Sequence, residues 1–102
     1  MSSIRVRAQL RDGVTQVRAL ISHPMETGQR TGNDGQKIPA HYITRVKATV
    51  GDRHVLTAHW GPGISRNPYL SFRFEGASSG DTLKVSWEDN KGESDSTEAE
   101  IA

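Results

Sequence analysis

Apolar and polar residues alternate along most of this chain, and no stretch repeats its apolar residues with the 3.6-residue period of a helix. In IRVRAQL, residues 4–10, apolar side chains occupy every second position and arginine or glutamine the positions between them. Because successive side chains of a strand point to opposite faces, this pattern is typical of a strand with one buried and one wet face. The sequence therefore predicts an all-β fold.

Similar alternating stretches recur along the chain and are separated by turn signals such as Asp12-Gly13. Short strands without helices are typical of a sandwich, so we predict an immunoglobulin-like β-sandwich of about seven antiparallel strands. At 102 residues the chain fits a single domain, residues 1–102, with one modest core. The expected strands cover residues 4–10, 17–21, 42–50, 53–60, 70–74, 83–87 and 97–101.

The hairpin over residues 42–60 contains a conflict of register. A two-residue turn at Gly51-Asp52 pairs Val50 with Arg53, whereas burial of the apolar residues favours a pairing shifted by one residue. Either a β-bulge absorbs this shift, or both faces of the hairpin are partly covered.

The supply of core-forming residues is small. Leu, Ile, Val and Phe total 20 of 102 residues, close to the level at which chains become disordered, but disorder also requires a strong net charge and here it is +1. We therefore expect a folded domain with a thin core, of the kind that often completes its burial against a partner.

The small net charge hides an uneven distribution. Residues 1–74 hold 11 Lys and Arg against 4 Asp and Glu, whereas residues 75–102 hold 2 against 8. The basic residues are dispersed along the sequence and no aromatic-rich RNA-binding signature accompanies them, so no nucleic-acid partner is expected. The charges are interpreted as the wet faces of strands, with neighbouring elements of opposite sign.

The chain contains no cysteine, which excludes disulfides, a thiolate nucleophile and thiolate-bound metal centres. The N-terminal MSSIRVRAQLRD has no apolar signal region, and no run approaches the 18 apolar residues of a membrane span. We expect a soluble protein without a membrane partner that is not exported by a signal of its own.

Residues 22–41 form a long irregular segment rich in Gly, Pro, Thr, Asn and Asp, and such loops in compact domains are often functional. His23, Met25 and Glu26 stand near its start, and His41 stands at its end. If His23 and His41 converge, with Met25 or Glu26, they could bind copper. A small periplasmic metal-binding β-sandwich is therefore the alternative hypothesis.

Local motifs for chemistry are absent from the sequence. The histidines show neither HxH nor HxxxH spacing, and His54 and His59 are expected on opposite faces of one strand. The serines lack a GxSxG elbow, and the carboxylates from Asp89 to Glu100 are expected to be solvated, without the burial that makes a general acid. We predict no catalytic residues, no cofactor and no enzyme activity.

Two irregular segments are predicted to meet a partner. An Asn-Pro turn precedes a strand whose Leu70, Phe72 and Phe74 are expected to be buried, with Tyr69 on the opposite face, where an aromatic residue suits an interface. Met25 is either tucked against the domain or offered to a partner, since both fit a thioether in a turn. The predicted interface residues are His23, Pro24, Met25, Glu26, Asn67, Pro68 and Tyr69.

Three segments have a distinctive sequence: SHPMETGQR at residues 22–30, Lys37-Ile38-Pro39, and the block from Gly63 to Leu70 with its NPYL motif. Together they closely resemble the SoxZ family, the cysteine-free subunits of the sulfur-carrier complex in bacterial thiosulfate oxidation. The resemblance covers essentially the whole chain in order, with matching length and strand pattern.

The resemblance implies an immunoglobulin-like sandwich that binds a SoxY subunit as a heterodimer and makes transient contacts with other Sox enzymes. SoxY, not SoxZ, carries the C-terminal cysteine that holds the sulfur intermediates, so this chain is expected to support and present the carrier without catalysing a reaction. When it is expressed alone, a homodimer is an alternative assembly. The resemblance also implies a periplasmic location, reached by co-export with SoxY.

Overall fold

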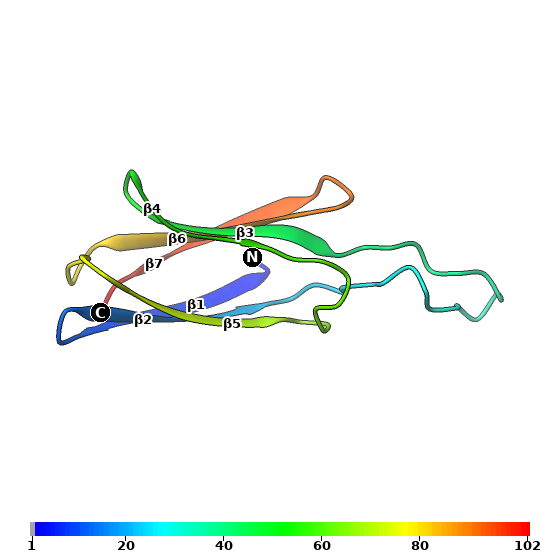
Figure 1. Ribbon diagram of the computed structural model, residues 1–102, viewed down its shortest axis with the longest axis horizontal. Coiled ribbons are helices and arrows are strands. Elements are labelled where there is room, and N and C mark those ends of the chain that lie inside the picture. Colours follow the sequence, from blue (N-terminus) through cyan, green and yellow to red (C-terminus); the bar gives the residue numbers. More distant parts are fainter. Residues whose placement is uncertain (1) are drawn as a thin grey trace.

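Seven β-strands form two sheets that pack face to face (Figure 1). The structure is a computed structural model that describes residues 2–102. All pairings between the strands are antiparallel. The strands are β1 (Ile4–Arg11), β2 (Val14–Ile21), β3 (Ile43–Val50), β4 (Arg53–His59), β5 (Tyr69–Glu75), β6 (Thr82–Asp89) and β7 (Ser94–Glu100).

The strand order is that of an immunoglobulin-like sandwich, and the predicted fold class is confirmed. One sheet has the order β1-β2-β5 and the other β4-β3-β6-β7, so β4 joins β3 rather than β5. The largest boundary differences from prediction are three residues, at Val14 and Ser94, because pairing there continues to the tight turn. No helix within the described residues is long and apolar enough to cross a membrane.

The core lies between the sheets and consists largely of the alternate residues that the pattern predicted, with Ile43 added by a register shift near the start of β3. The side chains of Ile21, Ile43, Leu83 and Ile101 are fully buried. Burial of each such aliphatic side chain contributes roughly 2 kcal/mol to folding.

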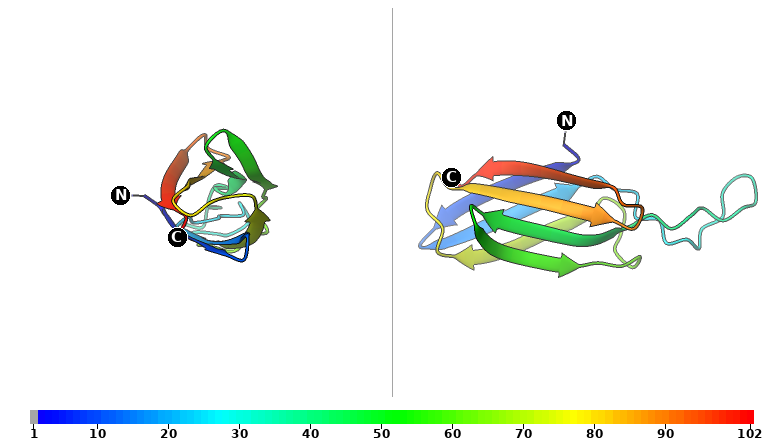
Figure 2. Two further views of the ribbon diagram at one scale, coloured as in Figure 1. Left: turned by 90° about the vertical axis from the view of Figure 1, so that its left-hand side faces the viewer. Right: turned by 90° about the horizontal axis from the view of Figure 1, so that it is seen from above.

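One long side of the sandwich is closed where β1 meets β7 (Figure 2). The backbone N–H of Leu10 donates to the carbonyl of Ala102 at 2.9 Å. Near the other end of β1, the Asp95 carboxylate accepts the Ser3 N–H at 2.7 Å, and Trp87 Nε1 donates to Ser3 Oγ at 3.0 Å. Hydrogen bonds therefore fasten both ends of this side.

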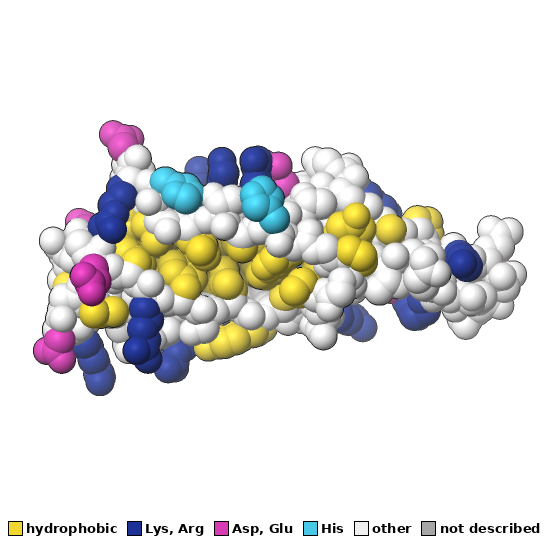
Figure 3. All heavy atoms as spheres, viewed as in Figure 1, with side chains coloured by type: hydrophobic (Ala, Val, Ile, Leu, Met, Phe, Trp, Pro, Cys, Tyr) yellow, Lys and Arg dark blue, Asp and Glu magenta, His cyan; other side chains and the backbone are white. Residues whose placement is uncertain are grey.

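The opposite side, between β4 and β5, is open. Each of these strands pairs with one neighbour only, and their inward-facing apolar side chains are half-buried. Figure 3 shows a continuous band of hydrophobic atoms along this side. The prediction that β5 buries its apolar residues is therefore corrected, because no strand covers them from beyond the edge. The residues are Leu70, Phe72 and Phe74.

A β-bulge resolves the register conflict in the hairpin of β3 and β4, as one of the two predicted solutions. Ala48 pairs with Leu56 but Thr49 pairs with His54, which leaves one extra residue in β4. The extra residue reverses the alternation within β4. His54 and His59 therefore lie on the same outer face, and the prediction of opposite faces was wrong.

The irregular segment before β3 extends beyond the sandwich as an arm, residues 24–41 (Figures 1 and 2). Isolated bridges between Glu26 and His41 and between Thr31 and Lys37 join its two limbs. The molecule is consequently elongated, with principal extents of 53 × 24 × 21 Å. Most of residues 27–39 are exposed, and the arm contributes Met25 to the core at its base.

The hydroxyl of Thr15 offers a test of the core. It is fully buried on the inner face of β2, and its Oγ1 has no hydrogen-bond partner among the described residues. Thr15→Val keeps the shape and removes the unpaired hydroxyl, so we expect the free energy of unfolding to rise by about 1 kcal/mol. Urea denaturation measures this difference, and a loss of stability would show that the hydroxyl is satisfied.

Candidate functional site

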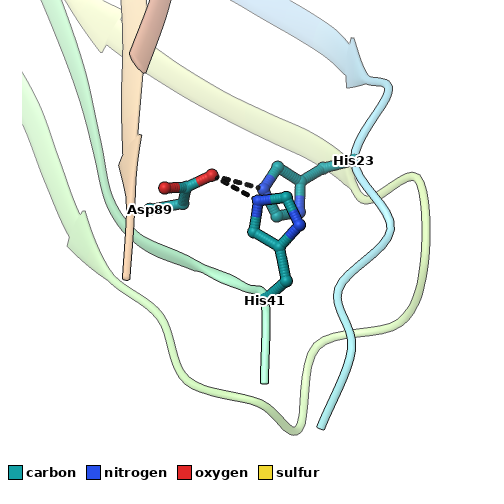
Figure 4. A group of neighbouring side chains, drawn as sticks. All are labelled: His23, His41 and Asp89. Atoms are coloured by element: carbon teal, nitrogen blue, oxygen red, sulfur yellow. Dashed lines mark hydrogen bonds and ion pairs between the residues drawn. The ribbon is translucent and has the colours of Figure 1, made fainter. Parts of the chain in front are cut away.

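A buried carboxylate, that of Asp89, faces two adjacent histidine rings at the base of the arm (Figure 4). Its Oδ2 is 3.0 Å from Nε2 of His23 and 2.8 Å from Nε2 of His41. The side chains of Asp89 and His23 are 0% and 2% exposed, and that of His41 is 18% exposed. The long-range convergence of the two histidines is therefore present, and both rings approach the same oxygen of an aspartate.

Strand alternation explains why these three side chains meet. His23 and Asp89 each follow the last buried hydrophobic residue of β2 and β6 by two positions, and His41 precedes the first buried residue of β3 by two. Residues two apart on an extended chain share a face, so each polar side chain continues an inward-facing series. Because Ile43 pairs with Asp89, the strand ends lie at the same end of the sandwich.

The Asp89 carboxylate accepts four hydrogen bonds. Oδ2 accepts from both histidines, and Oδ1 accepts the backbone N–H groups of Lys91 at 3.0 Å and Glu93 at 2.9 Å. Burial by itself would raise the pKa of Asp89, but the hydrogen bonds from His23, Glu93, His41 and Lys91 outweigh it and hold this pKa below its usual value. The group is therefore a satisfied buried anion that joins three segments of the chain.

The proton of His23 can be assigned from its second nitrogen. The backbone N–H of Met25 donates to His23 Nδ1 at 3.1 Å, so Nδ1 is an acceptor and the proton lies on Nε2, pointing at Asp89. A metal ion would need that nitrogen unprotonated. Although three ligand atoms of the cluster lie within 4.8 Å of one another, the hydrogen bonds fit a structural cluster better than a ligand set.

The other members of the predicted copper set have different partners. Met25 is 5% exposed, and its sulfur accepts the backbone N–H of Ile43 at 3.3 Å, so this residue is tucked against its own domain. Glu26 forms an ion pair with Arg30 on the arm. The thioether and this carboxylate are thus engaged by groups outside the cluster.

Asn67 joins the two segments that were predicted to meet a partner. Its Oδ1 accepts the His23 N–H at 3.1 Å, and its own N–H donates to the His23 carbonyl at 3.0 Å. Asn67 has φ of 52°, a left-handed conformation that asparagine tolerates better than most residues. The HPMETG and NPYL motifs therefore form one structural unit beside the Asp89 cluster.

The predicted interface residues divide by accessibility. Three are buried within this chain and four are accessible, and contact of the seven residues with a partner remains a prediction. The buried residues are His23, Met25 and Pro68, and the accessible ones are Pro24, Glu26, Asn67 and Tyr69.

The sequence prediction missed the role of Asp89, which was grouped with the solvated carboxylates of the terminal hairpin. In the structure its side chain is buried and β6 ends with it. The signal was available, because Asp89 continues the alternation of Leu83, Val85 and Trp87. The turn composition of residues 89–92 concealed it.

Comparison with protein families identifies the chain. The family model described as "Sulphur oxidation protein SoxZ" matches residues 4–100. The chain belongs to the SoxZ family. The family resemblance of the two motifs is thereby confirmed, and this SoxZ-family chain has a role in the Sox system of sulfur oxidation.

Other comparisons bear on the fold of this SoxZ-family chain. No curated protein matches it. Among solved structures, superoxide reductase (neelaredoxin) from Archaeoglobus fulgidus in the reduced form is similar with a TM-score of 0.63, covering 100% of this chain and 87% of that one at 18% identity. At this identity the likeness shows the sandwich fold alone.

Replacement of Asp89 tests the cluster. In Asp89→Asn the amide nitrogen faces groups that donated hydrogen bonds to one carboxylate oxygen. Those buried donors lose their acceptor, and the negative charge is lost as well. We expect the free energy of unfolding to fall by about 3 kcal/mol. Asp52, which is exposed in the turn between β3 and β4, provides the control. Asp52→Asn is expected to change stability by less than about 0.5 kcal/mol. Chemical denaturation of both variants near neutral pH makes the comparison.

Wild type and Asp89→Asn together test how stability depends on pH. The pKa of Asp89 is lower in the folded than in the unfolded chain, so its contribution is present above the ordinary pKa of about 4 and is lost as pH falls through the lower folded value. The stability difference between wild type and Asp89→Asn should narrow as pH falls below about 4. If the stability difference between wild type and Asp89→Asn stays constant as the pH is lowered, the Asp89 charge is not its cause.

The metal alternative has its own measurement. Because Nε2 of His23 carries a proton and the carboxylate is already satisfied, calorimetric titration with Cu(I), Cu(II) and Zn(II) is expected to show no tight binding. A saturable isotherm that disappears in His41→Gln would restore the metal hypothesis.

Proposed function

We propose that this chain is the non-catalytic subunit of a SoxYZ sulfur-carrier complex and that it binds a SoxY-like subunit as a heterodimer. The observation that carries the proposal is the uncovered hydrophobic band between β4 and β5 (Figure 3). Family membership supports the biochemical setting, and the band supports a permanent partner in that setting.

The band has the properties of a surface that another chain covers. Its side chains include Leu56, Trp60, Phe72 and Phe74, which pack against the core yet remain half-exposed. Large apolar patches on a monomer mark interaction sites, and long-lived interfaces resemble a core cut in half. A partner seated here would complete the thin core.

The band is also flanked by two free strand edges. Within residues 2–102, β4 pairs only with β3 and β5 only with β2, so each presents unpaired backbone N–H and C=O groups along the band. Free edges are normally protected, and pairing with an incoming strand is a common mode of association. One partner could cover both the edges and the apolar side chains between them.

The absence of cysteine divides the chemistry between the proposed subunits. This chain has no thiol that could hold sulfur covalently, so the partner supplies the reactive group. The histidine–carboxylate cluster does not replace it, since the carboxylate is buried and its oxygens are occupied by four donors. The role proposed for this chain is to support and present the carrier to Sox enzymes, through transient contacts.

We further propose a periplasmic location, reached together with the SoxY-like subunit. This rests on the family resemblance, in which SoxY provides the export signal. Fractionation of source cells with and without the partner gene tests it, and an unchanged periplasmic level without the partner would contradict co-export.

Leu56 and Thr57 are adjacent residues of β4 that test the heterodimer. Leu56 faces the band and Thr57 the outer face. When co-expressed with a SoxY-like chain, wild type and Thr57→Lys should elute as a heterodimer, whereas Leu56→Lys should bind at least about tenfold more weakly, because a charge would be buried in an apolar interface.

The outcome is interpreted with two controls. Thermal unfolding of each variant alone separates a lost interface from a lost fold. Separate elution of the wild-type chains at micromolar concentration would refute the heterodimer, and light scattering of the chain alone would reveal whether it covers the band by forming a homodimer.

A further inference from the structure

The outer face of the three-stranded sheet concentrates positive charge. Strand pairing places Arg7 directly opposite Arg18, and Gln16 opposite Arg73. Basic side chains project from this side of the molecule, the lower edge in Figure 3. We call this surface the basic face, and its arginines are Arg5, Arg7, Arg11, Arg18 and Arg73.

The arginines of the basic face have no carboxylate partners. None of the ion pairs within residues 2–102 includes any of the five. Glu75 is the one acidic residue on the outer positions of the three strands. Arg73 is held instead by Gln16, whose Oε1 accepts its Nε–H at 2.6 Å, so the rest of the guanidinium is available.

The outer face of the other sheet provides an internal comparison. There Arg45 lies opposite Glu88 and forms an ion pair with it, and Lys84 lies opposite Glu98. Opposite charges face each other across strands on that sheet, which favours pairing. The sequence interpretation that neighbouring strands have opposite sign is correct for this sheet and wrong for the basic face.

The charges on the basic face lower the stability of the sheet that carries them. Like charges directly opposite each other on neighbouring strands are destabilising, and Arg7 with Arg18 is such a pair. The fold gathers arginines that are dispersed in the sequence, so the accumulation is a property of the sheet. An anionic surface brought against it would relieve this repulsion.

An apolar patch adjoins the arginines on the same face. Leu20 lies opposite Arg5 on one side and Tyr69 on the other. These two are the exposed large hydrophobic residues of the described chain, with 45% and 61% of their surface accessible. Tyrosine and arginine are enriched at protein interfaces and are the usual residues that dominate binding energy.

We propose that the basic face is a second docking surface, which binds an acidic protein surface that carries an apolar pocket for Leu20 and Tyr69. It is separate from the apolar band, because outward-facing and inward-facing residues of β5 belong to different faces. Charge guides the encounter and the two apolar side chains anchor it. The proposal does not depend on the identity of the subunit that covers the band.

Two features favour a protein over other anions. The arginines are spread over three strands rather than converging on one point, which suits an extended surface more than a single oxyanion. The exposed Leu20 has no role in phosphate recognition but fits a protein pocket. Electrostatic complementarity of this kind gives fast, salt-sensitive association, as a transient partner requires.

The test uses the full chain and a defined probe. The probe is a short glutamate-rich peptide with one central tryptophan, titrated at low salt while backbone amide signals are followed by NMR. Shifts are expected in β1, β2 and β5 at outward positions. Arg7→Gln combined with Arg18→Gln should weaken binding by about tenfold or more and lower its salt dependence.

A matched variant on the other sheet controls for net charge. Lys47→Gln combined with Lys84→Gln removes the same charge, and it should leave peptide binding within about twofold of wild type. Tyr69→Ala should weaken binding while retaining the salt dependence. Equal loss in both double variants, or no shifts at all with the acidic peptide, would overturn the proposal.

Other anions and a second copy are tested in parallel. A glutamine-substituted peptide should not bind. Three results would each overturn the choice of an acidic protein. The first is equal shifts with sodium thiosulfate alone, and the second is stronger binding of an oligonucleotide or of phosphatidylglycerol vesicles than of the peptide. The third is self-association of the wild type that the arginine variant abolishes.

Discussion

The buried Asp89 carboxylate is the constraint on which the arm end of the structure depends. A buried negative charge must accept hydrogen bonds in place of water. For Asp89 the donors come from the end of β2, the start of β3 and the turn after β6. His23, one of the two histidines bonded to Asp89, also donates its backbone N–H to Asn67. Removal of this anion would remove the side-chain bonds that tie His23 and His41 to the end of β6.

The two long sides of the sandwich differ, and so do its two outer faces. These differences place the two proposed interactions on separate surfaces. Hydrogen bonds close the side between β1 and β7, whereas the side between β4 and β5 leaves apolar atoms uncovered. One sheet has an outer face of paired opposite charges and the other has unpaired arginines. A small domain without a thiol thus has two distinct surfaces, one for each of the proposed partners.

Much of the fold was predictable because burial on one face imposes a period of two. The same rule, continued past the last hydrophobic residue, would have placed His23 and Asp89 inside the sandwich. The conclusion was missed because Asp, Asn and Gly after β6 also signal a turn. The half-burial of Phe72 could not be read in this way, since alternation gives the direction of a side chain and not what covers it.

The sequence by itself determined the strands, most of their inward faces, the lack of thiol chemistry and membership of the SoxZ family, since each depends on residue identity and local spacing. Tertiary structure alone decided which distant residues meet. It brought two histidines to one carboxylate, used a bulge to put His54 and His59 on one face, and paired Arg7 with Arg18. Register between strands fixes these contacts, and register is set by the whole sandwich.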